Sequence, residues 1–327
     1  MTVSSTPRFT FVRALGPIVL VSSTALLAAE ASASPGRMTA AANITLRQAP
    51  SADAPVVAFL PLGTEVTDAG PSGLDKTWVH VHLSDNREGW LLANLTREID
   101  PAHRTVTVER IILDRLDRHG DGFASAVELS NFVERELTSV TEPQAAARFD
   151  LYRLRAVAEV LSTIRSGQDR RDPCFSWLDR HKGLVVYDKP GSTWLLSNAA
   201  VWQMHDQHPT SAVADDIAWI AAGTGLPGEC AGSLVCYAES LDRLDGEYLR
   251  RHPTGHHVDE AVNRIGDAAA QLSPTPRTLY VFDRSHDCTS LGRALDSLEG
   301  AVATSNAVGK DGTVQHLAAI RGVCGPR

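Results

Sequence analysis

Residues 117–128 could bind a metal cation, because they carry several oxygen-bearing side chains at close spacing. They read Asp-Arg-His-Gly-Asp-Gly-Phe-Ala-Ser-Ala-Val-Glu. Calcium takes about six to eight oxygen ligands, which carboxylates, hydroxyls and backbone carbonyls supply. Apolar residues with helical spacing lie on both sides, so the pattern predicts two helices joined by an oxygen-rich loop. The residues of these two stripes are Val108, Ile111, Ile112 and Leu116, then Leu129, Phe132 and Val133.

Segment 108–133 resembles a degenerate EF-hand, the helix–loop–helix motif of calcium-binding proteins. The resemblance implies that Ca²⁺ is held by the side chains of Asp117, Asp121, Ser125 and Glu128 and by the backbone carbonyl of Phe123. Gly122 matches the glycine that the turn of the loop needs, whereas His119 stands where an oxygen ligand belongs. Two interpretations stay open: a calcium site, and a glycine-rich turn that only links two helices.

Histidines are the other candidates for chemistry. His205, His208, His252, His256 and His257 lie in the C-terminal half, and His286 precedes Asp287 and Cys288. Residues adjacent in a chain rarely meet as nucleophile and base. The sequence contains no Gly-x-Ser-x-Gly, no His-Glu-x-x-His and no phosphate loop. We therefore expect a protein that is not an enzyme; a hydrolase with dispersed catalytic residues is the weaker alternative.

The five cysteines all lie in the C-terminal half. Their spacings do not form the two close ligand pairs that are typical of a structural zinc site. Cys230 and Cys236 are close enough in sequence to favour a disulfide, and Cys288 with Cys324 is the simplest second pair, which leaves Cys174 over. Sequence alone does not fix the connectivity, so other pairings stay open.

Residues 43–98 predict a small all-β module, because short alternating apolar runs are separated by turns rich in Pro, Gly, Ser and Asp. In the run from Trp78 to Leu83, alternation places Val79, Val81 and Leu83 on one face. We expect this face to be the core. Trp78, His80 and His82 then share the opposite face.

The order of these runs resembles the bacterial SH3-type (SH3b) domain, a binding or spacer module found mostly on exported proteins. The resemblance implies an SH3-like barrel. It also implies a ligand groove lined by Trp78 and Trp90, with peptidoglycan or an envelope protein as the partner. The fold class expected for the whole chain is multidomain: this barrel, a helix–loop–helix at 105–137, and then a mainly α-helical domain at 143–327.

Residues 1–33 predict an export signal, followed by a linker at 34–42. Arg8 and Arg13 precede an apolar run from Leu15 to Ala29, and Ala31-Ser32-Ala33 is typical of a cleavage site. We expect a periplasmic or secreted protein with no membrane-spanning segment after removal of the signal. The net charge of −8 argues against a nucleic-acid partner.

A two-unit repeat lies within residues 200–270. His208-Pro209 and His252-Pro253 are 44 residues apart, as are the acidic residues Asp215 and Asp259. Proline ends one helix and the carboxylate favours the start of the next. The segment resembles tetratricopeptide-type helical hairpins. Since such arrays need about three units, flanking helices must complete the core.

N-terminal to this repeat, residues 183–187 and 192–196 predict a β-hairpin. Together these features predict an exported, non-enzymatic envelope protein with a helical scaffold; a calcium-binding regulatory or structural protein is the alternative.

Overall fold

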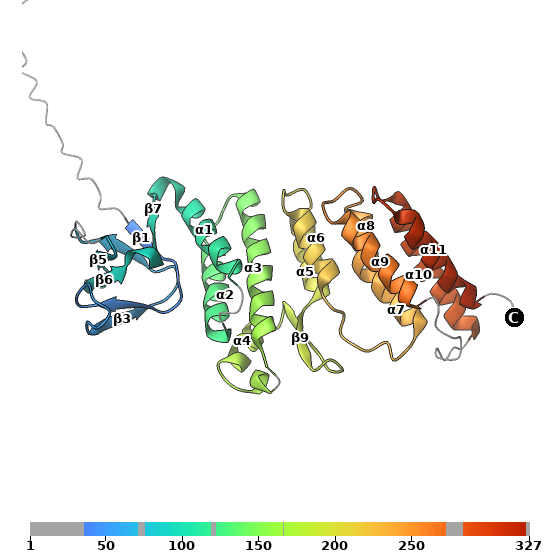
Figure 1. Cartoon of the computed structure of the whole chain (residues 1–327), viewed down its shortest axis with the longest axis horizontal. Helices are drawn as coiled ribbons and strands as arrows, with labels where there is room; N and C mark the ends of the chain where they lie inside the picture. Colours follow the sequence, from blue (N-terminus) through green and yellow to red (C-terminus); the bar gives the residue numbers. More distant parts are fainter. Residues whose placement is uncertain (1–35, 71–75, 119–121, 166, 273–283, 325–327) are drawn as a thin grey trace, which may run out of the picture. The chain divides into compact units, whose positions relative to one another are not determined.

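A computed structural model describes residues 36–70, 76–118, 122–165, 167–272 and 284–324, all of which belong to one unit. The predicted signal segment lies outside these residues, as do His119 and Asp121 of the predicted calcium loop. Figure 1 follows the chain from the N-terminal strands to the C-terminal helices.

Seven strands form one antiparallel sheet in the order β3-β2-β6-β5-β4-β1-β7. The prediction of an all-β module is therefore confirmed, and the strand order is that of an open sheet with β3 and β7 at its edges. One strand, β1, forms within the predicted linker. The strands are β1 (Gly36–Thr39), β2 (Ile44–Arg47), β3 (Val56–Leu60), β4 (Glu65–Asp68), β5 (Trp78–His82), β6 (Glu88–Leu92) and β7 (Thr96–Ile99).

One face of this sheet carries its own core. Val79, Val81 and Leu83 are buried there, as the alternation predicts, against side chains from β2, β3, β4 and β6. His80 and His82 lie on the opposite face, half-buried and exposed respectively. Because side chains alternate along a strand, the core fixes which residues the sheet presents outward.

A second core joins the sheet to the first helices, α1 (Arg104–Leu116), α2 (Phe123–Leu137) and α3 (Pro143–Thr163). Met38, Ala40 and Leu62 of the β module pack there against side chains of all three helices, including Phe132. The β module thus shares a hydrophobic core with the first three helices and is not a separately packed domain. Glu142 caps α3 by accepting the backbone N–H groups of Gln144 and Ala145.

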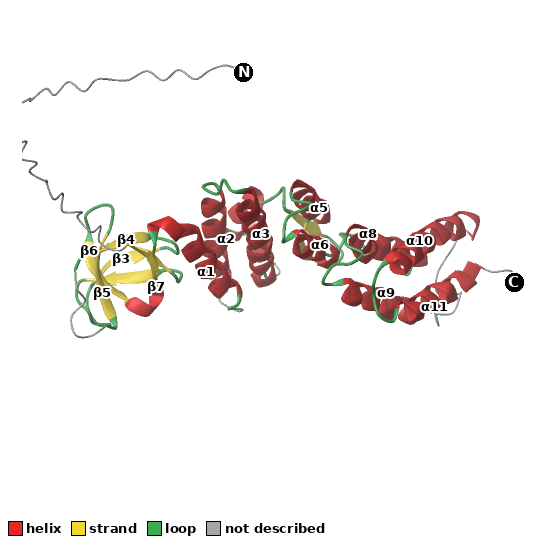
Figure 2. Cartoon of the chain, turned by 90° about the horizontal axis from the view of Figure 1, so that it is seen from above, coloured by secondary structure: helices red, strands yellow, loops and turns green. Residues whose placement is uncertain are grey.

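The rest of the described chain is mainly helical, with one small hairpin. The elements are α4 (Cys174–Arg180), β8 (Val185–Asp188), β9 (Thr193–Leu196), α5 (Asn198–Gln207), α6 (Ala214–Gly223), α7 (Leu234–Leu241), α8 (Glu247–Arg251), α9 (Val258–Leu272), α10 (Arg284–Thr304) and α11 (Lys310–Arg321). Figure 2 shows β8 and β9 among helices, apart from the N-terminal sheet. The prediction of the hairpin and of a mainly helical region is confirmed.

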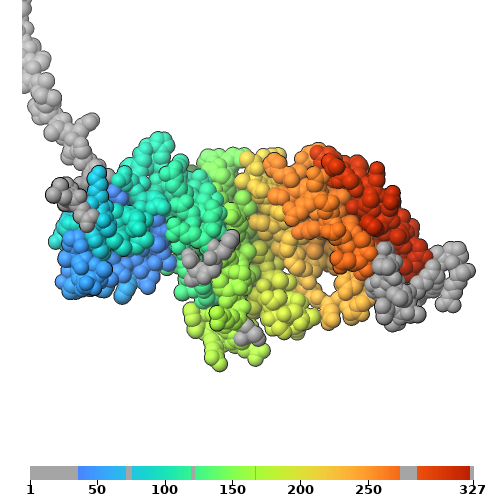
Figure 3. All heavy atoms as spheres, in the orientation of Figure 1, coloured from blue at the N-terminus to red at the C-terminus, as the bar shows by residue number. Residues whose placement is uncertain are grey.

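The predicted repeat folds as two helical hairpins, α5–α6 and α8–α9. Each contains the same turn: the Ser211 N–H donates to the His208 carbonyl, and the Gly255 N–H donates to the His252 carbonyl. Their core continues on both sides, toward α3 and toward α10 and α11. Figure 3 shows these segments side by side in chain order. The flanking helices therefore complete the core that two hairpins alone would leave open.

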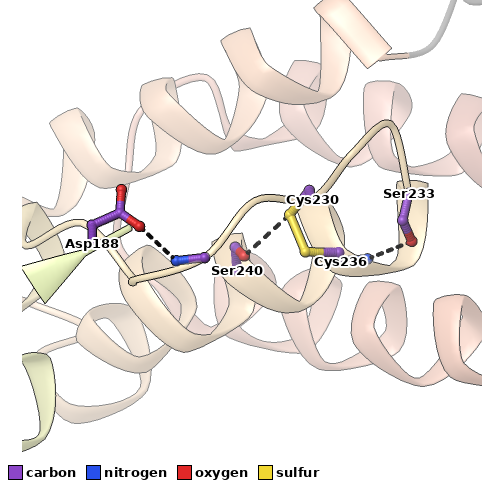
Figure 4. Close-up of a disulfide and its surroundings, with 6 residues drawn as sticks. Asp188, Cys230, Ser233, Cys236 and Ser240 are labelled. Atoms are coloured by element: carbon purple, nitrogen blue, oxygen red, sulfur yellow. Dashed lines mark hydrogen bonds between the residues drawn. A yellow bond between two sulfur atoms is a disulfide. The ribbon is translucent and has the colours of Figure 1, made fainter. Parts of the chain in front are cut away.

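Both predicted disulfides are present. Cys230–Cys236 ties the loop before α7 to the first turn of that helix, and Cys288–Cys324 ties the start of α10 to the turn after α11. Figure 4 shows the first bridge, with Ser233 accepting the Cys236 N–H and the buried Asp188 accepting the Gly228 N–H. Cys174 is a buried free thiol whose pKa is raised by burial.

Candidate functional site

The outward face of the N-terminal sheet carries a stacked pair of rings. His80 on β5 lies opposite Trp90 on β6, with ring centroids 4.7 Å apart and planes 17° from parallel. Arg47 on β2 is the next residue in the same row, opposite Trp90. Residues directly opposite on neighbouring strands point to the same side of a sheet, so these three side chains share one surface.

Apolar side chains extend this surface toward the sheet edge. Phe59 on β3 lies opposite Thr45 and is 63% exposed, and Val56 lies opposite Arg47 and is 44% exposed. We call Arg47, Val56, Phe59, His80 and Trp90 the aromatic face. This side of the sheet thus combines an exposed phenylalanine with a half-buried tryptophan and an arginine, and tryptophan and arginine are enriched in binding hot spots.

The sequence predicted only part of this face. Trp90 belongs to it, whereas Trp78 is only 8% exposed and contributes mainly to packing. Phe59 was not predicted as a site residue. Phe59 alternates with Leu60, which is directed into the core, and this alternation was the signal that places Phe59 outward; the register shift between Leu46 and Arg47 then brings Val56 to the same face. At the same surface, His82 lies 3.5 Å from the carboxylate of Glu88.

The residues predicted to bind calcium have separate partners in the described part of the chain. Asp117 is exposed and lies 3.8 Å from Arg155. Ser125 accepts a hydrogen bond from Arg115. Glu128 accepts the backbone N–H groups of Leu62 and Asn43. Phe123 is the first residue of α2.

Within the described residues, no cluster of three or more His, Cys, Asp or Glu side chains is placed to hold a metal ion. Asp121 lies outside these residues, so the calcium site stays a prediction. The carboxylate of Glu128, which the resemblance makes the last ligand of the loop, is hydrogen-bonded to the β module in this structure.

The histidines of the repeat meet where the two hairpins contact each other. Nε2 of His205 on α5 lies 2.8 Å from Nε2 of His252, which follows α8. Between two nitrogens this close, one must donate a proton and the other must accept it. Both rings are largely buried. Burial lowers the pKa of His252, with further contributions from His205 and Arg251, while Asp215 acts in the opposite direction.

Asp215, at the start of α6, organises the same contact. Its carboxylate accepts the Tyr248 hydroxyl at 2.7 Å and the His256 backbone N–H at 2.8 Å. One repeat later, Asp259 accepts the Val308 backbone N–H at 2.8 Å. The acidic residue of each repeat thus holds the turn of the next hairpin. This is a structural role for the carboxylates that the sequence placed at helix starts.

The remaining candidate for a nucleophile is engaged elsewhere. Cys288 is disulfide-bonded to Cys324, so its thiol is not available to pair with His286.

His208 lies 2.9 Å from the largely buried carboxylate of Asp150 on α3, and this contact fixes the start of the α5–α6 turn. Burial and the hydrogen bond to Asp215 raise the pKa of Tyr248 well above its usual range.

Comparison of the chain with protein-family models, with curated proteins and with solved structures found no significant match. None of the helices in the described ranges combines the length and the apolar character that crossing a membrane requires.

Proposed function

We propose that this chain is an exported, non-catalytic binding protein of the cell envelope. Its N-terminal β module acts as an SH3b-like domain that binds peptidoglycan, and its helical hairpins act as a scaffold. The observation that carries the proposal is the aromatic face: the stacked pair of His80 and Trp90 lies next to Arg47, and the exposed ring of Phe59 shares this side of the sheet.

The chemistry of this face supports a sugar–peptide polymer as the ligand. Aromatic rings provide rigid apolar surface at low cost in conformational entropy. Arg47 adds a guanidinium that can pair with the carboxylates of a peptide stem. Its Nη1 donates to the Ala54 carbonyl at 2.7 Å, which holds the side chain over the sheet. Much of this surface is therefore already positioned before a ligand arrives.

The shared core supports a scaffold role for the helices. Met38, Ala40 and Leu62 are buried against α1, α2 and α3, so the β module is held by packing rather than by a tether. Export is supported by the signal pattern of residues 1–33 and by two disulfides, which persist in oxidising compartments.

Co-sedimentation with purified, insoluble peptidoglycan tests the proposal with the full chain lacking residues 1–33. We expect the protein to sediment with the polymer, and Phe59→Ala to weaken the binding about tenfold or more, as truncation of a hot-spot residue does. Phe175→Ala is the matched control, since Phe175 on α4 is 58% exposed but lies outside the aromatic face. Absence of sedimentation, or equal losses for the two variants, would overturn the proposal.

A further inference from the structure

The hairpin β8–β9 has an open edge along β9. The Ser197 N–H donates to the Leu184 carbonyl at 2.8 Å, and the register places Leu196 opposite Val185 and Trp194 opposite Tyr187. Hydrogen-bonded and non-hydrogen-bonded pairs alternate in an antiparallel ladder. The backbone N–H and C=O groups of Trp194 and Leu196 therefore point away from β8. In the described ranges, no further strand pairs with β9.

An apolar groove of about 490 Å³ follows this edge. All four residues of β9 line it, together with Leu161 of α3 and with Trp219 and Ile220 of α6. The groove therefore presents open backbone groups beside apolar side chains. Unpaired strand edges with this environment are templates for a further strand.

A second cavity, of about 250 Å³, adjoins the groove and shares Thr193 and Trp194 with it. The aromatic pair Tyr187 and Trp194 forms one side, and Arg165 and Arg170 contribute guanidinium groups. Both arginines are exposed, and neither has an ion pair within the part of the chain that the structure describes. The one carboxylate lining this cavity is that of Asp169, which accepts the indole N–H of Trp194 at 3.3 Å. The cavity therefore carries an excess of positive charge.

We propose that β9 and these two cavities form a docking site for an extended peptide segment of a partner protein, with alternating apolar residues and an acidic C-terminal end. The N–H and C=O groups of β9 that point away from β8 alternate at the spacing of a β ladder, which an added polypeptide strand matches group for group. Alternate side chains of the added strand fill the groove beside Trp219. The positive cavity complements a carboxylate.

The position of the arginines also gives the direction of the peptide. The positively charged cavity adjoins Thr193, the first residue of β9, whereas the apolar groove continues to Leu196. A strand antiparallel to β9 brings its C-terminal end beside Thr193. Antiparallel addition, the commoner arrangement, therefore places the free carboxylate or a terminal Asp or Glu next to Arg165 and Arg170.

An array of random peptides of about ten residues with free C-termini, probed with the full chain lacking residues 1–33, tests this inference. We expect binders with alternating apolar residues and an acidic C-terminus. The double variant R165E/R170E should weaken the best binder tenfold or more. R180E, which reverses the charge of an exposed arginine on α4, should leave it unchanged. Circular dichroism confirms that each variant is folded.

The role of the backbone has its own test. Two versions of the best binder are compared, one methylated at its odd-numbered backbone nitrogens and one at its even-numbered ones. One version should lose binding and the other should keep it, because an added strand directs only every second N–H to β9. The inference is overturned if no peptide binds above background, if binders lack the acidic end, or if R180E weakens binding as much as R165E/R170E. Peptidoglycan binding, which depends on Phe59, is measured separately and fails or succeeds independently.

Discussion

The carboxylate of Glu128 on α2 accepts a hydrogen bond from the backbone N–H of Leu62, the residue after β3 and Pro61. Leu62 is only 1% exposed and packs in the core that the β module shares with α1, α2 and α3. Glu128 also lies 3.4 Å from the Asn43 backbone nitrogen. A single side chain thus bridges two turns of the β module to the helical part.

Replacing Glu128 should therefore loosen the junction. Glu128→Ala leaves the buried N–H of Leu62 without its acceptor, so we expect a loss of about 1–3 kcal/mol in the free energy of unfolding, measured with urea. Glu128→Gln keeps an acceptor oxygen and should lose less. Glu239→Ala, at an exposed position on α7, should change the value by less than about 0.5 kcal/mol. Equal effects of the two alanine variants would contradict this role for Glu128.

The calcium hypothesis makes a different prediction for the same residue. If residues 117–128 bind Ca²⁺ as an EF-hand does, both Asp117→Asn and Glu128→Gln should abolish the heat of calcium binding in a calorimetric titration. Asp114→Asn is the control, because Asp114 pairs with Arg97 on β7 and lies before the loop. An isotherm of Glu128→Gln equal to that of the unmodified chain would reject the EF-hand site.

At the junction between the β module and the helices, Gly63 should be the glycine that tolerates replacement by alanine least. It has a φ of +76°, and a Cβ atom at this position would overlap the ring of Phe132. Gly309 has a similar φ of +82° but no atom within 4 Å of its Cβ position. We expect Gly309→Ala to cost about 1 kcal/mol from the left-handed backbone alone. Gly63→Ala should cost about 1–3 kcal/mol more because it overpacks the core. Equal urea-unfolding midpoints for Gly63→Ala and Gly309→Ala would refute this difference.

The pair of His205 and His252 should make stability depend on pH. The pKa of His252 is lowered in the folded chain, so the unfolded chain takes up a proton first as pH falls below about 6.5. Stability due to this residue is therefore complete above that pH and decreases below it. We expect His252→Gln to flatten the fall in Tm between about pH 7.5 and 5.5.

A buried carboxylate acts with the opposite sign at the acidic end of this range. Burial raises the pKa of Asp245 from 3.8 to about 6 although Arg264 opposes the shift, so its contribution to stability is lost as pH rises from about 4 to about 6 and stays constant above. The informative quantity is thus the difference in the slope of Tm against pH between the unmodified chain and His252→Gln. His316→Gln, an exposed position on α11, is the control and should keep the original slope. A slope unchanged in His252→Gln would disprove the role of the pair.

Local patterns predicted much of the fold. Alternation identified the buried face of residues 79–83, two short apolar runs predicted the β8–β9 hairpin, and cysteine spacing favoured both disulfides. The strand β1 was missed because its four residues carry no alternation and pair only with distant β4 and β7.

The contacts that build the candidate sites are less accessible to sequence reasoning. Phe59 joins Trp90 only through the pairing of β3, β2 and β6. His205 meets His252 only because successive hairpins stack. Such contacts depend on register and packing between distant segments, which periodicity within one segment does not encode.

Hydrogen–deuterium exchange of the full chain lacking residues 1–33, with and without soluble peptidoglycan fragments, tests whether the aromatic face binds the cell wall. We expect slower exchange in β2, β3 and β6 around Arg47, Phe59 and Trp90, and unchanged exchange in α5 to α11. Phe59→Ala should remove the protection, whereas Phe175→Ala should retain it. Exchange that is unchanged in the β module, or slowed only in the helices, would contradict the claim that the aromatic face binds the cell wall.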